Sequence, residues 1–377
     1  MCRAPHRRGG LDRLDGLRGV VRSDSMTRAP DDCTVDYLVG CVWGCKARCI
    51  AQHAWSLGGR VAIRLQAVRR AAGHRNVTMA GFSARLARPP FSAPMRPPMN
   101  LVIQSTAPLS ADHHKTLVAL ARGSHAAVID ANAIRIADAN VAQRADLEIY
   151  CGTHQLDYAF VEPGRQLRDF GLVAMDMDST LITIECIDEI ADFCGFKAEV
   201  AAITEASMRG EIKDFNESLT RRVALLKGLD AGALERVYEE RLQLSPGAEQ
   251  MLAGAKAAGL KTLLVSGGFT FFTEKLKARL GLDFTRANTL EIVDGKLTGN
   301  VVGEIVNADV KARTLRETCA QLGIEPTRAI AMGDGSNDLK MMAAAGLSVA
   351  FRAKPVVREA ASVAFNHVGL DGLLRLF

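Results

Sequence analysis

Long apolar runs are absent from this sequence of 377 residues. No stretch of about 18 consecutive apolar residues occurs, which argues against a membrane-spanning helix. There is also no internal repeat and no long low-complexity tract. The hydrophobic content of 48% and the charged content of 24% are ordinary for a globular protein, and the length is sufficient for two or three domains.

Glutamate is missing from residues 1–98, and lysine is nearly missing there. This segment carries 16 Arg and one Lys against six Asp, a net charge of +11, whereas the remaining residues carry 30 basic and 36 acidic side chains, a net charge of −6. The positive charge of the whole chain therefore belongs to its first quarter, and we expect no nucleic-acid partner for the rest.

The same segment ends in a proline-rich stretch, "PPFSAPMRPP", just before Met99. We favour the interpretation that translation starts at Met99 and that residues 1–98 are a non-native extension. The alternatives are a disordered tail, an Arg-rich targeting segment or a metal site whose ligand spacing fits zinc only loosely. That metal site would use Cys33, Cys41, Cys45 and Cys49.

The cysteines beyond residue 98 form no pattern. They are Cys151, Cys186, Cys194 and Cys319. Because no convincing secretory signal accompanies them, we expect reduced thiols, a cytoplasmic location and no membrane partner.

Residues 99–165 have the pattern of a small α/β module. "NLVIQSTA" predicts a strand, "SADHHKTLVALARG" a helix capped by Ser110, and "HAAVIDANAIRIADA" two strands. A connector then leads to a second part, residues 166–377, in which strands and helices alternate.

That alternation predicts a doubly wound parallel sheet covered by helices, with ligands at the carboxyl ends of its strands. A largely helical stretch interrupts it after the first strand, so we expect a cap at about residues 190–245. Ser245 and Pro246 predict the start of the next helix, with Ser245 as its N-cap. Asp294 and Gly295 predict the turn of a hairpin.

Three predicted strands end in polar clusters, "DMDST", "VSGG" and "MGDGSND". If strand geometry lasts through the first cluster, Asp176 and Asp178 point the same way. Asp334 and Asp338 add two acids at a neighbouring strand end. Four carboxylates in one crevice repel one another unless a cation lies among them, and an oxygen-only site suits Mg²⁺.

Donors for a phosphate group accompany these acids. Ser266 offers a hydroxyl, Gly267 and Gly268 offer backbone N–H groups, and Lys311 offers a cation at the start of a predicted helix. An Asp-x-Asp pair alone is most simply a surface turn. Here, however, three polar clusters at strand ends and a lysine at a helix start occur in one order along the chain, which argues against coincidence.

The four motifs resemble those of the haloacid dehalogenase superfamily, and more closely those of its phosphoserine phosphatases, from Gly171 to the C-terminus. The resemblance implies that Asp176 attacks phosphorus and becomes an aspartyl-phosphate. It implies that Asp178 protonates the leaving alkoxide and then activates water. Asp176, the backbone carbonyl of Asp178 and Asp334 would hold Mg²⁺, with Asp338 in support.

The resemblance also assigns roles around the phosphate and in the cap. Ser266 and Lys311 would neutralise phosphoryl oxygens, with Thr180 and Asn337 in supporting roles. Glu185, nine residues after Asp176, matches the family's ammonium-binding glutamate.

Three further cap residues match the family's apolar lid and its carboxylate-binding arginine. They are Met208, Phe215 and Arg222. Each could instead be an ordinary core or surface residue, and Arg221 is an alternative to Arg222.

The resemblance implies a Mg²⁺-dependent hydrolysis of O-phospho-L-serine to L-serine and phosphate, the last step of serine biosynthesis. A phosphatase of the same fold for another small ester, such as phosphohomoserine, is the main alternative, and a non-catalytic phosphate-binding regulator is a weaker one. Residues 99–165 resemble the small regulatory modules of some bacterial members, and a homodimer is compatible with the resemblance.

Overall fold

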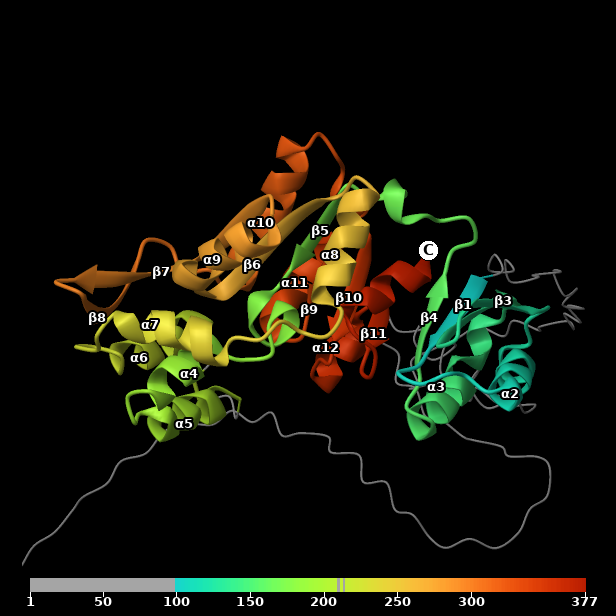
Figure 1. Cartoon of the computed structure of the whole chain (residues 1–377), viewed down its shortest axis with the longest axis horizontal. Helices are drawn as coiled ribbons and strands as arrows, with labels where there is room; N and C mark the ends of the chain where they lie inside the picture. The colour runs from blue at the N-terminus through green and yellow to red at the C-terminus, as the bar shows by residue number, and fades with distance from the viewer. Residues whose placement is uncertain (1–98, 209–210, 213) are drawn as a thin grey trace, which may run out of the picture. The chain divides into compact units, whose positions relative to one another are not determined.

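The computed structural model describes residues 99–208, 211–212 and 214–377 (Figure 1), and the structural statements below refer to these residues. They all belong to one compact unit. The hypotheses on residues 1–98, including the cysteine metal site, lie outside the described residues. Among the described residues, no helix has the length and the apolar character that crossing a membrane requires.

The first module is an antiparallel sheet with the strand order β2–β3–β1–β4, covered by two helices. Leu101 and Ile103 of β1 pack with Leu117 and Leu147 from the two helices. Ser110 caps the first helix as predicted, and its hydroxyl accepts the N–H of His113 at 3.2 Å. The elements are β1 (Met99–Gln104), α2 (Ala111–Ala121), β2 (Ala126–Asp130), β3 (Ala133–Ala139), α3 (Arg144–Thr153) and β4 (Asp157–Val161).

The larger sheet has the strand order β11–β10–β9–β5–β6–β7–β8 and is parallel except for the β7–β8 hairpin. The hairpin turns at Asp294 and Gly295, as the sequence predicts. The strands are β5 (Leu172–Met175), β6 (Lys261–Phe269), β7 (Phe284–Val293), β8 (Lys296–Val302), β9 (Ala329–Gly333), β10 (Leu347–Phe351) and β11 (Val363–Phe365).

The central strand β5 contributes side chains to two hydrophobic cores, one on each face of the sheet. Val173 and Met175 pack in one cluster, and Leu172 and Ala174 pack in the other. All four are essentially inaccessible to solvent. A strand covered on both faces has no polar alternation, which explains why this segment is continuously apolar. The doubly wound sheet is therefore confirmed.

Helices cover both faces of this sheet. Helices α8 and α9 contribute to the core of Val173 and Met175, whereas α10, α11 and α12 contribute to the core of Leu172 and Ala174. These helices are α8 (Ala248–Ala257), α9 (Thr270–Leu280), α10 (Ala308–Gln321), α11 (Leu339–Ala344) and α12 (Pro355–Ala360).

The predicted start of α8 is wrong. The N-cap is Gly247 rather than Ser245, because Ser245 to Ala248 form a turn before the helix, in which the carbonyl of Ser245 accepts the N–H of Ala248 at 3.1 Å. Gly247 then adopts a φ of 78°, and a Cβ there would lie 2.1 Å from Oδ1 of Asp371. Glycine is the residue that fits this turn.

A helical insertion leaves the sheet after β5 and returns before α8. An antiparallel bridge between Ile182 and Leu244 marks its two ends, so the insertion begins earlier than the predicted residue 190 and includes α4. The N–H of Gly228 donates to the carbonyl of Leu297 at 2.7 Å, which fastens the insertion to the hairpin (Figure 1). Its helices are α4 (Cys186–Asp192), α5 (Lys197–Met208), α6 (Phe215–Ala224) and α7 (Gly232–Arg236).

The first module is bonded to the larger sheet through Asp157 at the start of β4. This carboxylate is 2% exposed and accepts the N–H groups of Asn366 at 2.8 Å and of His367 and Val368 at 2.9 Å. Val102 of β1 also packs in the larger core. Hydrophobic contact and a buried hydrogen-bond cluster therefore join the two parts.

Candidate active site

Strand β5 delivers Asp176 to the carboxyl edge of the sheet. The N–H of Asp176 still donates to the carbonyl of Met332 on β9 at 3.0 Å, but a π-helical turn at Met177–Leu181 follows at once. The expectation that strand geometry lasts through the motif is therefore wrong. Asp178 has an extended backbone within this turn, and Ser179 has a φ of 55°, so the chain bends sharply while both carboxylates line one cavity.

Lys311 lies fully buried between two of the four predicted acids. Its Nζ is 2.7 Å from Oδ2 of Asp176 and 2.8 Å from Oδ1 of Asp338. Burial by itself lowers the pKa of Lys311, but the two carboxylates raise that pKa overall, so the side chain stays cationic. Asn307 caps α10 and so places Lys311 in the first turn of that helix.

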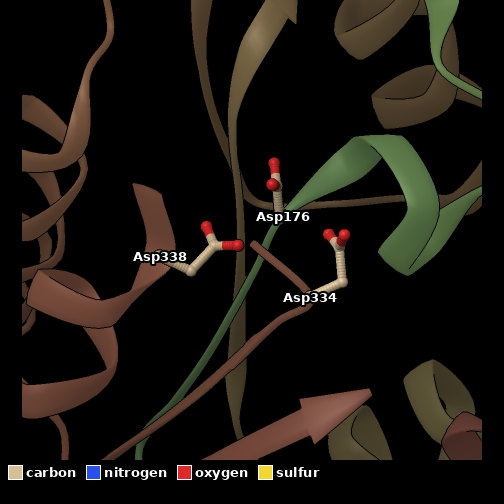
Figure 2. A group of neighbouring side chains, drawn as sticks. All are labelled: Asp176, Asp334 and Asp338. Atoms are coloured by element: carbon tan, nitrogen blue, oxygen red, sulfur yellow. The ribbon is translucent and has the colours of Figure 1, made fainter. Parts of the chain in front are cut away.

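Three carboxylates converge on a site with the character of a metal centre. Oxygen atoms of Asp176, Asp334 and Asp338 lie within 4.8 Å of one another, and Figure 2 shows the three side chains gathered beside the strand ends. Burial, followed by repulsion from Asp338, raises the pKa of Asp334 to about 6 and raises the pKa of Asp176 well above its usual range. A divalent cation would offset this repulsion, and an all-oxygen donor set suits such a cation.

The carboxyl end of β6, where its pairing with β7 is irregular, brings the predicted phosphate donors beside these acids. The fully buried hydroxyl of Ser266 donates to Oδ2 of Asp178 at 3.3 Å and accepts the N–H of Gly268 at 2.8 Å. A Cβ on Gly268 would lie 2.5 Å from Oδ2 of Asp178, so this approach requires glycine. Asn288 donates to the carbonyl of Gly267 at 2.7 Å and holds this end of β6 in place.

The side chains surround a cavity of about 370 Å³. The predicted site residues that line it are Asp176, Asp178, Glu185, Phe215, Arg222, Gly267, Gly268, Asp334 and Asn337. Ser266, Lys311 and Thr180 lie behind this wall, and each is bonded to a lining carboxylate. The side chain of the predicted Met208 lies outside the described residues.

Glu185 and Arg222 bring an acidic and a basic side chain to the cavity from the insertion. Glu185 is exposed to the cavity and accepts the hydroxyl of Ser179 at 2.7 Å. Loss of solvent, followed by repulsion from Asp178, raises the pKa of Glu185 to about 8. Nε of Arg222 donates to the carbonyl of Ser218 at 3.3 Å, which leaves its remaining N–H groups for a ligand.

The neighbouring Arg221 does not line the cavity. It is exposed and pairs with Glu217 one turn earlier on α6. The sequence leaves a choice between the two arginines, and Arg222 is the one whose side chain lines the cavity.

Sequence reasoning missed several lining residues. Lys354 follows β10, and its N–H donates to the carbonyl of Asp334 at 3.2 Å. A basic residue three positions after the end of a predicted parallel strand was the signal that could have found it. The other missed lining residues with polar side chains are Asp188, Thr204, Ser218 and Ser336.

A sheet of this topology with acids at the carboxyl end of its central strand defines a class of hydrolase. The sequence model of the haloacid dehalogenase-like hydrolases matches residues 173–343, a range that contains all four motifs. A second model, for a domain of unknown function named DUF4072, matches residues 101–147 of the first module.

Individual relatives indicate the family within this class of hydrolases. A phosphoserine phosphatase of Polaromonas sp. (strain JS666) is 61% identical over 218 residues, which cover 57% of this chain and 92% of that protein. The structure of a probable phosphoserine phosphatase from Vibrio cholerae is 39% identical, has a TM-score of 0.64, and is matched over 74% of this chain and 86% of its own. A phospho-aspartyl intermediate analogue of phosphoserine phosphatase is 39% identical, has a TM-score of 0.52, and is matched over 55% of this chain and 98% of its own. The chain therefore belongs to the phosphoserine phosphatases, a family of haloacid dehalogenase-like hydrolases.

Proposed function

We propose that the protein hydrolyses O-phospho-L-serine to L-serine and phosphate, and so performs the last step of serine synthesis. One observation carries this proposal. A single cavity holds a carboxylate pair for phosphoryl transfer, Asp176 and Asp178, together with an acidic and a basic side chain, Glu185 and Arg222. Phosphoserine carries a phosphate, an ammonium and a carboxylate, and each has a complementary group in this cavity.

Asp176 is the nucleophile in this mechanism. One of its carboxylate oxygens attacks phosphorus, and the bond between phosphorus and the seryl oxygen breaks. Asp178 protonates the departing seryl oxygen. Burial raises the pKa of Asp178, which favours the protonated form that a general acid needs.

Asp178 then acts as the base in the second half of the reaction. It takes a proton from water as the water oxygen attacks phosphorus, and the bond to the Asp176 oxygen breaks to release phosphate. The hydrogen bond from the N–H of Cys186 to Oδ1 of Asp178, 2.9 Å long, holds this carboxylate in one orientation through both steps. The mechanism thus needs no additional base.

Lys311 and Ser266 stabilise the charge on the phosphoryl oxygens. Both are fully buried, so their donors are already oriented when the substrate arrives, and the surrounding low dielectric strengthens each interaction. Gly267 and Gly268 let the phosphate approach the backbone at the carboxyl end of β6.

We also propose Mg²⁺ as the metal of this site. Asp176, Asp334 and the backbone carbonyl of Asp178 would hold it, and Asp338, which is paired with Lys311, would support them. When bound, Mg²⁺ neutralises phosphate charge and holds the reacting groups together. Thr180 donates to Oδ1 of Asp334 at 3.2 Å and would orient that ligand, and Asn337, which lines the cavity, would contact the phosphate.

The cap residues select the substrate. Glu185 would bind the ammonium and Arg222 the carboxylate, and Phe215 and Met208 would supply the apolar lid. The aromatic ring of Phe215 lines the cavity, and its Cζ would lie 3.0 Å from a Cβ built on Gly267. A closed pocket of this kind strengthens both charged contacts.

Phosphate release from a panel of esters tests the proposal. The panel contains phosphoserine, phosphohomoserine, a sugar phosphate and para-nitrophenyl phosphate, each with Mg²⁺ and with the metal chelated. We expect the highest kcat/KM for phosphoserine and loss of turnover on chelation, with recovery when Mg²⁺ is restored. A higher kcat/KM for phosphohomoserine would reassign the substrate, and no turnover of any ester would indicate a regulator.

The remaining proposals concern partners and location. The partner is a small molecule, and we propose a cytoplasmic location, which the four free thiols among the described residues support. The net charge of −6 beyond residue 98 supports the absence of a nucleic-acid partner. Three statements stay predictions: that the protein forms a homodimer, that residues 99–165 act as a regulatory module, and that the cap is a separate functional unit.

A further inference from the structure

Asp188 in the first turn of α4 contains a buried carboxylate oxygen without a hydrogen-bond partner in the described part of the chain. The residue lines the same cavity as Asp176, and its Oδ1 is inaccessible to solvent. Buried carboxylate oxygens are normally paired, because burying one unpaired is costly. An unpaired oxygen beside a substrate cavity therefore requires an explanation beyond packing.

Arg222 is in a matching situation on α6. It also lines the cavity, and no carboxylate among the described residues lies within 4.0 Å of its guanidinium. Among the described residues, its Nε hydrogen bond to the carbonyl of Ser218 is its sole anchor, and that bond is to its own helix. The side chain is thus half-buried without a close counter-charge.

Each of these two residues is the main opposite charge acting on the other. Burial lowers the pKa of Arg222, and Asp188 is the largest influence that opposes this effect. Burial raises the pKa of Asp188, and Arg222 is again the largest opposing influence. Lys197 also acts on Asp188, but its Nζ lies 3.7 Å from Asp192, and Glu185 is already bonded to Ser179.

We propose that Asp188 is a positioning residue that orients the guanidinium of Arg222 towards the substrate carboxylate. The inference rests on the proposed function. A carboxylate on the protein side of a guanidinium attracts one edge of it, so that the other edge faces the ligand. Because Oδ1 of Asp188 is shielded from solvent, a substrate cannot reach that atom, which favours an action through Arg222 over direct contact with the ammonium.

Two truncated substrates separate these two actions. Phosphoethanolamine keeps the ammonium of phosphoserine and lacks the carboxylate, whereas 3-phosphooxypropanoate keeps the carboxylate and lacks the ammonium. For Asp188→Asn we expect KM to rise about tenfold for phosphoserine and for 3-phosphooxypropanoate, with kcat within about twofold. We expect kcat/KM for phosphoethanolamine to stay within about twofold of wild type.

Asp192→Asn is the matched control. It removes the same charge from the same helix, but Asp192 faces Arg241 and Lys197 rather than the cavity. This variant should keep the wild-type KM for all three substrates. If Asp188→Asn fails to fold, as melting would show, Asp188→Glu takes its place, because a longer side chain keeps the charge but misplaces it.

A double-mutant cycle completes the test. If Asp188 acts through Arg222, Asp188→Asn should change KM by less than about twofold when Arg222→Gln is already present. Additive effects, or a loss confined to substrates with an ammonium, would overturn the inference while the wild-type protein still prefers phosphoserine. A wild-type protein that did not distinguish phosphoserine from phosphoethanolamine would overturn the proposed function as well.

Discussion

Arg222 is the side chain on which the specificity of the site depends most directly. A lost charge-assisted contact in a closed pocket is worth about 2 to 4 kcal/mol. Arg222→Ala should therefore lower kcat/KM for phosphoserine by roughly thirtyfold to a thousandfold. Hydrolysis of para-nitrophenyl phosphate, which has no carboxylate, should barely change. Steady-state kinetics on both esters measure the difference.

Arg221→Ala is the control for this comparison, because Arg221 pairs with exposed Glu217 and lies off the cavity. It should leave both activities close to wild type. Equal losses on both esters in Arg222→Ala would mean that Arg222 serves the folding of the cap. A loss of phosphoserine hydrolysis in Arg221→Ala alone would reverse the assignment.

Single residues were the most predictable part of the site, but only where a motif contained them. Asp176 and Asp334 follow strands, Ser266 lies near the carboxyl end of one, and Lys311 opens a helix. Linear spacing alone therefore places these residues at one edge of the sheet. The role of Asp188 depends on its distance from another helix, which no local pattern encodes. The sequence likewise left the choice between Arg221 and Arg222 open, because both lie on one helix turn.

Helix α10 illustrates how an element supports the chemistry. Oδ1 of Asn307 accepts the N–H groups of Asp309 at 3.1 Å and Val310 at 3.2 Å, and its amide donates to Asn216 on α6 at 3.1 Å. Lys311 lies in the turn that this cap begins. The cap therefore fixes the start of the helix from which the buried ammonium reaches Asp176.

We expect Asn307→Ala to lower the free energy of unfolding by about 1 to 2 kcal/mol and Tm by a few degrees. Turnover of phosphoserine should also fall, because the helix turn that positions Lys311 is no longer held by the cap. Thermal melting and kinetics measure the two effects. Asn307→Ser keeps a capping oxygen and should retain most of the stability, and an unchanged Tm in Asn307→Ala would refute a structural role for the cap.

Elements were predicted well where hydrophobic pattern and turn chemistry agreed, as at β5 and at the Asp294–Gly295 hairpin. The start of α8 was mispredicted because Gly247 adopts a left-handed backbone against Asp371, and this tertiary contact delays the helix beyond Ser245. The insertion begins earlier than predicted for a similar reason. Its ends are set by the bridge between Ile182 and Leu244, which pairs residues far apart in sequence.

At the scale of the whole molecule, Asp157 joins the first module to the larger sheet. Asp157→Asn replaces one carboxylate oxygen with an NH₂ group, which cannot accept a hydrogen bond, so at least one of the three N–H groups loses its acceptor. We expect this loss to cost about 3 kcal/mol. Asp157→Asn should lower Tm by roughly 6 to 12 °C and speed hydrogen exchange at residues 366–368. Asp146→Asn, which changes an exposed residue of the same module, is the control and should alter neither Tm nor this exchange. Unchanged exchange at residues 366–368 would contradict this role.

Residues 1–98 pose a separate question for the whole chain. Their composition differs sharply from that of the remainder, and a proline-rich stretch separates them from Met99. A protein that starts at Met99 should therefore keep kcat/KM within about twofold of the full chain and a Tm within a few degrees of it. A Tm lower by more than several degrees would show that the segment packs on the described part.

The central claim is that Asp176 carries the phosphoryl group during turnover. Rapid acid quenching of the protein during hydrolysis of phosphoserine, followed by mass mapping of its peptides, measures this directly. We predict phosphate on Asp176, and neither phosphate nor turnover in Asp176→Asn, whose amide cannot accept a phosphoryl group. Phosphate on any other residue, or substantial turnover by Asp176→Asn with deamidation excluded, would contradict the account.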